Sequence, residues 1–203
     1  MAKVVKAEID LSTEEKIKEA ASKVFTKKGY GSARTRDIAE EAGINLALLN
    51  YYFRSKEKLF DIVMAERIQK LFGILTPVLN DTETTLEEKF EKITENYINM
   101  LIEHPDLPIF VLSELRNNPE RFADRLQAKT HLTQSVFIKQ LQEKGTEVHP
   151  FHFLMNLLGM IIFPFVGKPV LQTVTGGEEN YLALMEQRKN LIPKWLKMML
   201  AKA

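Results

Sequence analysis

Apolar side chains recur at helical spacing in the middle of the chain, between a clear start signal and a clear stop signal. The recurring residues are Leu86, Phe90, Ile93, Tyr97 and Leu101. Thr85 and Glu88 form a capping box at the start of this run, and Pro105 follows its end. Helical periodicity occupies most of the chain, whereas no convincing alternating pattern of a β-strand and no internal repeat is present. The sequence therefore predicts an all-α fold.

Start and stop signals divide the chain into about nine helices. The first is expected to begin after a capping box formed by Ser12 and Glu15 and to end before Gly29. The predicted helices span residues 13–28, 35–42, 46–53, 55–72, 85–104, 108–116, 119–143, 150–166 and 178–201, with a loop at 167–177. Pro164 and Pro193 lie inside the last two helices and are expected to kink them.

The composition suits one domain, or a small module joined to a larger one, because the chain has 203 residues of which 45% are hydrophobic. The net charge of +1 argues by itself neither for a nucleic-acid binder nor for a membrane-surface protein. Residues 1–60 hold twelve Lys and Arg against nine Asp and Glu, which leaves sixteen against eighteen for residues 61–203. A modest basic surplus therefore lies at the N-terminus, where phosphate contacts would need it.

The chain has no Cys, which excludes disulfides and thiolate zinc sites and is compatible with a reducing cytosol. The first sixteen residues lack the continuous apolar stretch of a signal peptide. The most apolar run, residues 157–166, is too short to span a bilayer and contains Pro164. We therefore expect a soluble, cytoplasmic protein without a membrane partner.

Two short helices near the N-terminus are joined by a turn that contains Gly43, and a longer helix precedes them. These are the ingredients of a helix-turn-helix, whose second helix lies in the major groove of DNA. On a helical wheel of residues 46–53, Leu46, Leu49 and Phe53 share one side and are expected to face the core. The helix-turn-helix is accordingly predicted at about residues 34–53.

The opposite side of that third helix carries Ala47, Leu48 and Tyr51, flanked by Asn50 and Tyr52. A solvated helix would normally be charged there, so either burial on both sides or DNA binding would explain the pattern. On DNA, Ala47 allows close backbone approach, Leu48 can contact a thymine methyl group, and Asn50 can pair with an adenine edge. Tyrosine hydroxyls can donate to phosphates.

Candidate phosphate anchors flank the same helix. Thr35 opens the second helix, where its hydroxyl and free backbone N–H groups can hold a phosphate oxygen. Arg54 precedes the fourth helix and Lys56 lies at its start. Any one of these alone is more often a solvated surface residue, so their joint placement carries the prediction. The predicted DNA-contacting residues are Thr35, Ala47, Leu48, Asn50, Tyr51, Tyr52, Arg54 and Lys56.

The stretch from Thr35 to Phe60, TRDIAEEAGINLALLNYYFRSKEKLF, closely resembles the DNA-binding signature of the TetR family of bacterial transcriptional regulators. Residues 20–31, AASKVFTKKGYG, resemble that family's first helix and its glycine-containing exit. The resemblance implies DNA contacts from Thr35, Ala47, Leu48, Tyr51, Tyr52 and Lys56. The commonest form of the motif has Ser-Lys-Gly-Thr at residues 45–48 and Tyr at residue 50. Because this chain has Asn-Leu-Ala-Leu and Asn there, its operator sequence is expected to be its own.

The fold class expected is thus an N-terminal three-helix DNA-binding domain, residues 1–70, followed by a larger helical domain, residues 71–203. The resemblance implies that the larger domain binds a small molecule and dimerises through its last two helices. Dimerisation also has its own logic, because two-fold pairing doubles the few contacts of one short helix-turn-helix on a palindromic operator. Residues 153–166 are apolar nearly all round, which burial against a partner or within a monomer core would explain. The candidate interface residues are Leu157, Met160, Ile161, Tyr181, Met185, Ile192 and Trp195.

Apolar and aromatic side chains with a few polar groups in the middle helices suit a small-molecule site, although such a stripe is more often ordinary core. Glu114 stands out, because a carboxylate beside an apolar run can meet a cationic ligand or pair with Arg116 or Arg121. The candidate lining residues are Phe90, Tyr97, Met100, Phe110, Glu114, Phe122, His131, Met155 and Phe163.

An enzyme is the main rival among the function classes. The close histidine pair, His149 and His152, lies at a predicted helix start and is more often a surface or capping feature than a metal site. No Gly-rich phosphate loop, H-E-x-x-H or G-x-S-x-G motif occurs, so neither catalysis nor a cofactor or metal is expected. The predicted function is a DNA-binding regulator, a repressor by resemblance, released by an unidentified small molecule. The alternative keeps DNA binding but places control with a protein partner or with the protein's abundance.

Overall fold

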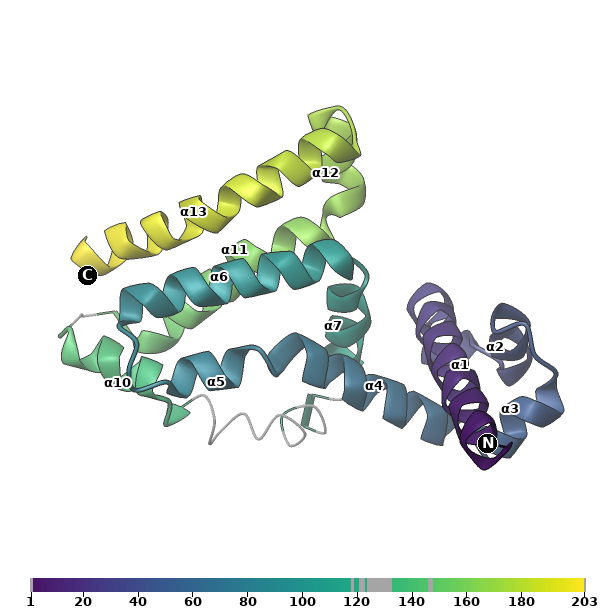
Figure 1. The fold of residues 1–203 in the computed structure, drawn as a ribbon. Coiled ribbons are helices and arrows are strands. Elements are labelled where there is room, and N and C mark those ends of the chain that lie inside the picture. Colours follow the sequence, from purple (N-terminus) through teal and green to yellow (C-terminus); the bar gives the residue numbers. More distant parts are fainter. Residues whose placement is uncertain (1, 118, 121–122, 124–132, 146–147, 203) are drawn as a thin grey trace. The chain divides into compact units, whose positions relative to one another are not determined.

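The computed structural model describes residues 2–117, 119–120, 123, 133–145 and 148–202 (Figure 1). This described part of the chain is all-α, as predicted, with eleven helices and no strand, which is more helices than the sequence indicated. The helices are α1 (Ala2–Ser32), α2 (Thr35–Glu41), α3 (Leu46–Tyr52), α4 (Lys56–Phe72), α5 (Leu75–Asn80), α6 (Leu86–Glu103), α7 (Leu107–Asn117), α10 (Val136–Glu143), α11 (Pro150–Val166), α12 (Lys168–Thr175) and α13 (Glu178–Lys202).

The chain divides into two compact units, Met1–Arg67 and Ile68–Ala203, and the division falls within α4. The first unit contains α1, α2, α3 and most of α4, and the second contains the remaining helices. The assignment of DNA binding to residues 1–70 and of effector binding and dimerisation to residues 71–203 remains a proposal.

The first unit is held together by apolar side chains from all four of its helices. α1 packs against α2, and α2 packs against α3. The fully buried large side chains include Ile17 of α1, Ile38 of α2, Leu49 of α3, and Leu59 and Met64 of α4. This core gives the two short helices, α2 and α3, the support that helices of their length need in water.

An ion pair adds to this core at Lys18 of α1, which is almost fully buried. Its Nζ lies 2.7 Å from a carboxylate oxygen of Glu66 on α4 and 2.5 Å from one of Glu15 on α1. Burial alone would lower the pKa of Lys18, but the hydrogen bonds to Glu15 and Glu66 outweigh it and raise the pKa above its ordinary value. The charged form of Lys18 therefore ties α4 to α1.

The first helix begins at Ala2, so the prediction that it starts after Ser12 is wrong. Residues 2–11 contain no Gly or Pro, and several of them are good helix formers, so a helix already formed extends through them at little cost. Near the other end, Gly29 leaves the helical conformation with φ 73° and ψ 160°. A positive φ of this kind is readily adopted by glycine, as expected for the exit of this helix.

Residues 167–177, predicted as a loop, contain α12. Pro169 fits the first turn of a helix, and Gly176 ends it in a left-handed conformation with φ 86°. Residues that were interpreted as loop signals are therefore the boundaries of a short helix.

Two further differences concern α5 and α10. Ser135 interrupts the predicted helix 119–143, because its backbone is extended and its hydroxyl accepts a hydrogen bond from the N–H of Ile138 in α10. Helix α5 was not predicted at all. Pro77 lies in its first turn, where the missing N–H of proline leaves no intrahelical bond unmade.

In the second unit, α13 packs along α6, and α11 contacts both of them (Figure 1). The predicted capping box of α6 is confirmed, with the N–H of Glu88 3.2 Å from the hydroxyl oxygen of Thr85. The buried sides of the three helices carry Phe90, Ile93, Tyr97 and Leu101 of α6, Leu157 and Ile161 of α11, and Tyr181, Met185, Ile192 and Leu196 of α13. This contact forms the centre of the unit.

α11 has the predicted bounds and consists almost entirely of apolar residues. Pro164 lies inside it, as Pro193 lies inside α13. Among the described residues, no single helix is both long and apolar enough to cross a membrane. α11 and α12 reach that length and composition only as a pair, which is bent by 72°.

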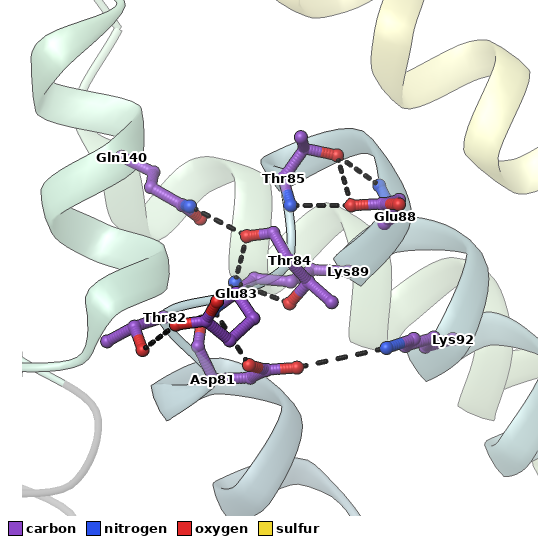
Figure 2. A network of polar contacts seen from close by, with 9 residues as sticks. All are labelled: Asp81, Thr82, Glu83, Thr84, Thr85, Glu88, Lys89, Lys92 and Gln140. Atoms are coloured by element: carbon purple, nitrogen blue, oxygen red, sulfur yellow. Dashed lines mark hydrogen bonds and ion pairs between the residues drawn. The ribbon is translucent and has the colours of Figure 1, made fainter.

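Lys89 of α6 is fully buried, and all three of its N–H donors are used (Figure 2). Its Nζ donates to the carbonyl oxygens of Asp81 and Thr84, at 2.6 and 2.7 Å, and to the Thr84 hydroxyl at 2.8 Å. Gln140 of α10 donates to the same Thr84 carbonyl at 2.9 Å. Burial lowers the pKa of Lys89, and the charge of Asp81 partly offsets this. The network fixes the turn between α5 and α6 and joins it to α10.

Pro164 removes one hydrogen bond from α11, because proline has no N–H to donate to the carbonyl of Met160. α13 supplies the missing donor, since Arg188 Nη2 donates to Met160 O at 2.7 Å. Tyr181 of α13 donates to the carbonyl of Pro164 itself at 3.2 Å. Two side chains of α13 therefore satisfy the carbonyl groups around the proline, at the expense of partly burying the Arg188 charge, which lowers its pKa.

Replacing Arg188 by methionine is expected to lower the free energy of unfolding by about 1–3 kcal/mol, because the partly buried carbonyl of Met160 loses its donor. In a Pro164→Ala background the same replacement is expected to cost less, since the backbone N–H of residue 164 can then bond to that carbonyl. Urea unfolding of the wild type, both single variants and the double variant measures the difference. An equal cost in both backgrounds would contradict this role of Arg188.

Candidate nucleic-acid interface

The turn between α2 and α3 ends α2 in a Schellman motif. The N–H of Ile44 bonds to the carbonyl of Ala39 at 3.0 Å, and the N–H of Gly43 bonds to that of Glu40 at 3.1 Å. Gly43 has φ 66°, and a Cβ placed on it would meet no atom within 4 Å. Glycine is therefore needed here for its backbone conformation and not for close packing.

Asn45 caps the start of α3, because its side-chain oxygen accepts a hydrogen bond from the N–H of Leu48 at 2.8 Å. Leu49, on its inner side, is only 1% exposed, and Phe53 at its C-cap is buried as well. Leu46 was expected inside too, but it is exposed, since the buried contact around Leu49 does not reach the first residue of the helix. Leu49 and Phe53 fix which side of α3 faces outward.

The outward side of α3 is open to solvent within its unit. Ala47 and Asn50 are exposed, and Tyr51 is 76% exposed. Leu48 and Tyr52 are half-buried, and the rings of Tyr51 and Tyr52 meet edge to face with centroids 5.4 Å apart. Burial of α3 on both sides therefore does not explain this composition, whereas contact with the edges of DNA bases remains chemically suitable.

Among the predicted phosphate anchors, Arg54 is exposed between α3 and α4. Thr35 is half-buried and is the first residue of α2. The cap position belongs to Arg34, whose backbone N–H donates to the Asp37 carboxylate at 3.0 Å. Lys56 is half-buried, and its Nζ donates to carbonyl groups at the end of α1.

Two lysines of α1 that contribute to the basic surplus are paired with acids of α2. Lys28 Nζ lies 3.0 Å from the carboxylate of Asp37, and Lys23 Nζ lies 3.5 Å from that of Glu41. The hydrogen bond from Lys28 is the main cause of a lowered pKa at Asp37. Arg36, in contrast, is an exposed cation of α2 that the sequence prediction left out. Its position directly after Thr35 was the available signal.

The sequence pattern of the family described as "Bacterial regulatory proteins, tetR family" matches residues 17–63, which extend from α1 into α4. YttP of Bacillus subtilis strain 168, described as a "Probable HTH-type transcriptional regulator", is 25% identical over 164 residues, or 77% of this chain and 78% of YttP. The chain belongs to the TetR family. It is therefore a DNA-binding transcriptional regulator of a non-enzymatic family.

Other relatives of this TetR-family chain agree with that assignment. The transcriptional repressor KstR2 of Mycolicibacterium smegmatis is 28% identical over 123 residues, which are 54% of this chain and 60% of KstR2. The fatty acid degradation regulator FadR from Bacillus halodurans has a TM-score of 0.60 at 19% identity, with 88% of this chain and 93% of FadR covered. FadR from Bacillus subtilis, solved in complex with stearoyl-CoA, has a TM-score of 0.59 at 17% identity, with 88% and 96% covered. The likeness to the two structures is one of fold.

The residues predicted for an effector site of this TetR-family chain separate into three groups. Phe90, Tyr97, Met100, Phe110 and Glu114 are buried on α6 and α7. Met155 and Phe163 are 55% and 68% exposed on α11 and do not belong to this buried group. The reason is that Leu157 and Ile161 occupy the side of α11 that packs into the unit. Phe122 and His131 lie outside the described residues.

Two hollows of the second unit lie along α11 and α13. One, of about 720 Å³, is lined by Val148, His152, Phe153, Asn156, Trp195, Met198 and Met199. The other, of about 190 Å³, is lined by Pro164, Leu171, Thr175, Tyr181, Leu184, Met185, Gln187, Arg188 and Leu191. Neither is lined by a predicted effector-site residue. No group of three or more His, Cys, Asp or Glu side chains that could hold a metal ion occurs in the described ranges.

Most residues predicted for a dimer interface belong instead to the core of the second unit. Leu157, Ile161, Tyr181, Met185 and Ile192 are buried, because they lie on the sides of α11 and α13 that pack against the unit's other helices. Met160 and Trp195 are half-buried. The large apolar side chains that α11, α12 and α13 leave exposed are Met155, Phe163, Val170, Val174, Leu184 and Met198. The exposed apolar stripe of each helix is therefore not the one that the sequence analysis selected.

Proposed function

We propose that this regulator is a repressor that binds a palindromic operator as a homodimer and releases it when a small molecule binds within residues 71–203. A dimer across a promoter represses by excluding the polymerase, and the relative KstR2 is a repressor. The outward side of α3, with Tyr51 at its most exposed point, is the surface proposed to read the operator.

The observation that carries the effector is a pair of hydroxyls on α6. Tyr97 Oη and Thr94 Oγ1 are buried and have no hydrogen-bond partner among the described residues. Their i, i+3 spacing puts them on one side of the helix. A buried polar group without a partner costs about 1–3 kcal/mol, a cost that a bound ligand with a matching polar group removes. Burial also raises the pKa of Tyr97, so its hydroxyl stays protonated and can donate.

A small-molecule effector is also supported by a protein of the same fold. FadR from Bacillus subtilis was solved in complex with stearoyl-CoA. For this chain we propose an effector with an apolar body and at least one hydrogen-bond acceptor atom. The apolar body would suit Phe90 and Met100, which are buried on α6 within four residues of Thr94 or Tyr97. The acceptor atom would receive the hydrogen bond that the Tyr97 hydroxyl can donate.

The homodimer is supported by the apolar row on α11 and α13. Met155, Phe163, Leu184 and Met198 are exposed there, and a group of large apolar side chains on a surface marks an interaction site. Gly159 lies between Met155 and Phe163 at i, i+4 and i+8 spacing and has no atom within 4 Å of its Cβ position. A helix of a second copy can therefore approach α11 closely at this point.

The effector proposal predicts that Tyr97→Phe raises the effector concentration needed for half-maximal release of DNA by roughly 5- to 10-fold, because one hydrogen bond to the ligand is lost. The operator is first recovered by selection from random-sequence DNA, and release is then followed by fluorescence anisotropy with a metabolite collection that includes stearoyl-CoA. Affinity for the operator without effector should not change. The melting temperature should stay the same or rise, since an unpartnered buried hydroxyl is removed.

Tyr181→Phe is the matched control, because Tyr181 is equally buried but its hydroxyl donates to the carbonyl of Pro164. This variant should lose stability, by about 0.5–1.5 kcal/mol, and keep the effector concentration of the wild type. If no compound releases the operator and occupancy follows protein concentration alone, the alternative of control by abundance or by a protein partner is favoured.

A further inference from the structure

Arg188 of α13 is a half-buried cation that has no acidic partner among the described residues. A guanidinium group has five N–H donors. One of them, on Nη2, bonds to the carbonyl of Met160 at 2.7 Å. Nε is buried, and it has no hydrogen-bond partner in the part of the chain that the structure describes. The bond to α11 therefore uses only a small part of what this group can donate.

Two carboxylates near Arg188 in sequence are bound to lysines instead. Glu178 lies 2.9 Å from Nζ of Lys168, and Glu186 lies 2.6 Å from Nζ of Lys189. The charge of Arg188 is thus not balanced by either of these acids. Because a partly buried charge without a counter-ion costs free energy, an anion that reaches the guanidinium is favoured at this place.

Arg188 lines the smaller hollow of the second unit, about 190 Å³, which lies between α11, α12 and α13. The hydroxyls of Thr175 and Tyr181 line it too, but both already donate to backbone carbonyls. Among the described lining residues Arg188 is the only charged one, and none is acidic. The apolar part of the lining consists of Pro164, Leu171, Leu184, Met185 and Leu191. The hollow therefore combines one cation with an apolar wall.

We propose that this hollow is a binding site for a small organic monocarboxylate. The carboxylate bonds to the guanidinium of Arg188, whose planar fork matches its two oxygens, and the apolar body lies against Leu171 and Leu191. A volume of about 190 Å³ equals the liquid volume of roughly six water molecules, so a short acid has a suitable size. This inference goes beyond the proposed function, because the hollow is not lined by Thr94 or Tyr97 and either site can exist without the other.

Hexanoate is the probe, and hexanamide is its uncharged match of the same length. Isothermal titration calorimetry at constant ionic strength should show one hexanoate per chain, bound at least about 10-fold more tightly than hexanamide, because charge-assisted hydrogen bonds are the stronger ones. Trp195 is the only tryptophan of the chain, and its ring centroid lies 5.5 Å from Cζ of Arg188. Its fluorescence should therefore change at the hexanoate concentrations at which the heat is released.

Arg188→Met is expected to weaken hexanoate binding by at least about 10-fold. The same change is made in a Pro164→Ala background, where the backbone N–H of residue 164 can bond to the carbonyl of Met160 and the fold no longer depends on Arg188 for that bond. Binding should weaken by at least about 10-fold there as well. Lys189→Met is the matched control: it removes the neighbouring cation, which does not line the hollow, and should bind hexanoate like the wild type.

Equal affinities for hexanoate and hexanamide, or no binding of either, overturn the inference. An affinity that Arg188→Met leaves unchanged in either background overturns it too. Leu184, which lines the hollow, also belongs to the apolar row proposed for the homodimer. If hexanoate does not bind and Arg188→Met weakens the association of two copies in sedimentation equilibrium, the anion that faces Arg188 comes from the second copy, and the monocarboxylate site is refuted.

Discussion

Replacing Tyr51 by glutamate is expected to lower the affinity of the protein for its operator by at least about 100-fold. Tyr51 is 76% exposed on the outward side of α3 and does not belong to the buried core, so the fold should be retained. The change removes a hydroxyl that can donate to DNA, a contact worth about 1–3 kcal/mol, and puts a carboxylate opposite the phosphates. Anisotropy with the selected operator measures the affinity, and circular dichroism measures the helix content.

Ala65→Glu is the control for the change in net charge. Ala65 is exposed on α4, nine residues beyond Lys56, and glutamate suits a helix there. We expect this variant to bind the operator within about threefold of the wild type, because its carboxylate lies more than a Debye length from the start of α4. If Tyr51→Glu binds like the wild type, α3 does not read DNA. If both variants weaken binding equally, the effect is one of overall charge.

The helix-turn-helix could be predicted well because its signals are local. The cap at Asn45 needs only a side chain three residues from an N–H, and the positive φ of Gly43 is a property of one residue. The burial of Leu49 and the exposure of Tyr51 follow from the 3.6-residue period of the helix. Leu46 shows the limit of this reasoning. A helical wheel gives the direction in which a side chain points, but it does not say whether the core extends as far as that residue.

The contacts of Lys56 within the chain show a second limit. Its Nζ donates to the carbonyls of Tyr30 and Ala33, which are 26 and 23 residues away, and no sequence pattern indicated these two hydrogen bonds. A lysine side chain is long enough to choose among several acceptors, and the choice depends on tertiary structure. The partners of Lys28 and Lys89, which are Asp37 and Thr84, also depend on tertiary structure, and counting charges in the sequence could not identify them.

The second unit was predicted less well for a related reason. α11 and α13 each carry apolar residues on more than one side, so periodicity cannot say which side packs against α6. Tyr181 and Ile192 were expected at an interface and are core, whereas Leu184 and Met198 are exposed. The boundaries of α12 were missed because proline and glycine, here Pro169 and Gly176, occur both in loops and at helix ends.

Replacing Phe163 by glutamate is expected to convert the proposed homodimer to a monomer at micromolar concentration. Phe163 is 68% exposed on α11, in the apolar row with Met155 and about one turn from Gly159. A second copy that packs there would bury the new carboxylate and leave it without a charged or hydrogen-bonding partner. Loss of the dimer should also lower operator affinity by about 100-fold or more, because the second half-site no longer binds as part of one molecule. Sedimentation equilibrium measures the association, and anisotropy measures the DNA affinity.

Leu115→Glu tests whether any new charge on the second unit has this effect. Leu115 is a large apolar residue exposed on α7, outside the row on α11 and α13. Because no contact with a second copy is proposed for it, this variant should remain dimeric and keep its operator affinity. A Phe163→Glu protein that stays dimeric shows that the copies meet elsewhere. If the variant is monomeric and still binds the operator tightly, dimerisation is not required for tight DNA binding. The proposal of a palindromic operator bound by a homodimer would then be wrong.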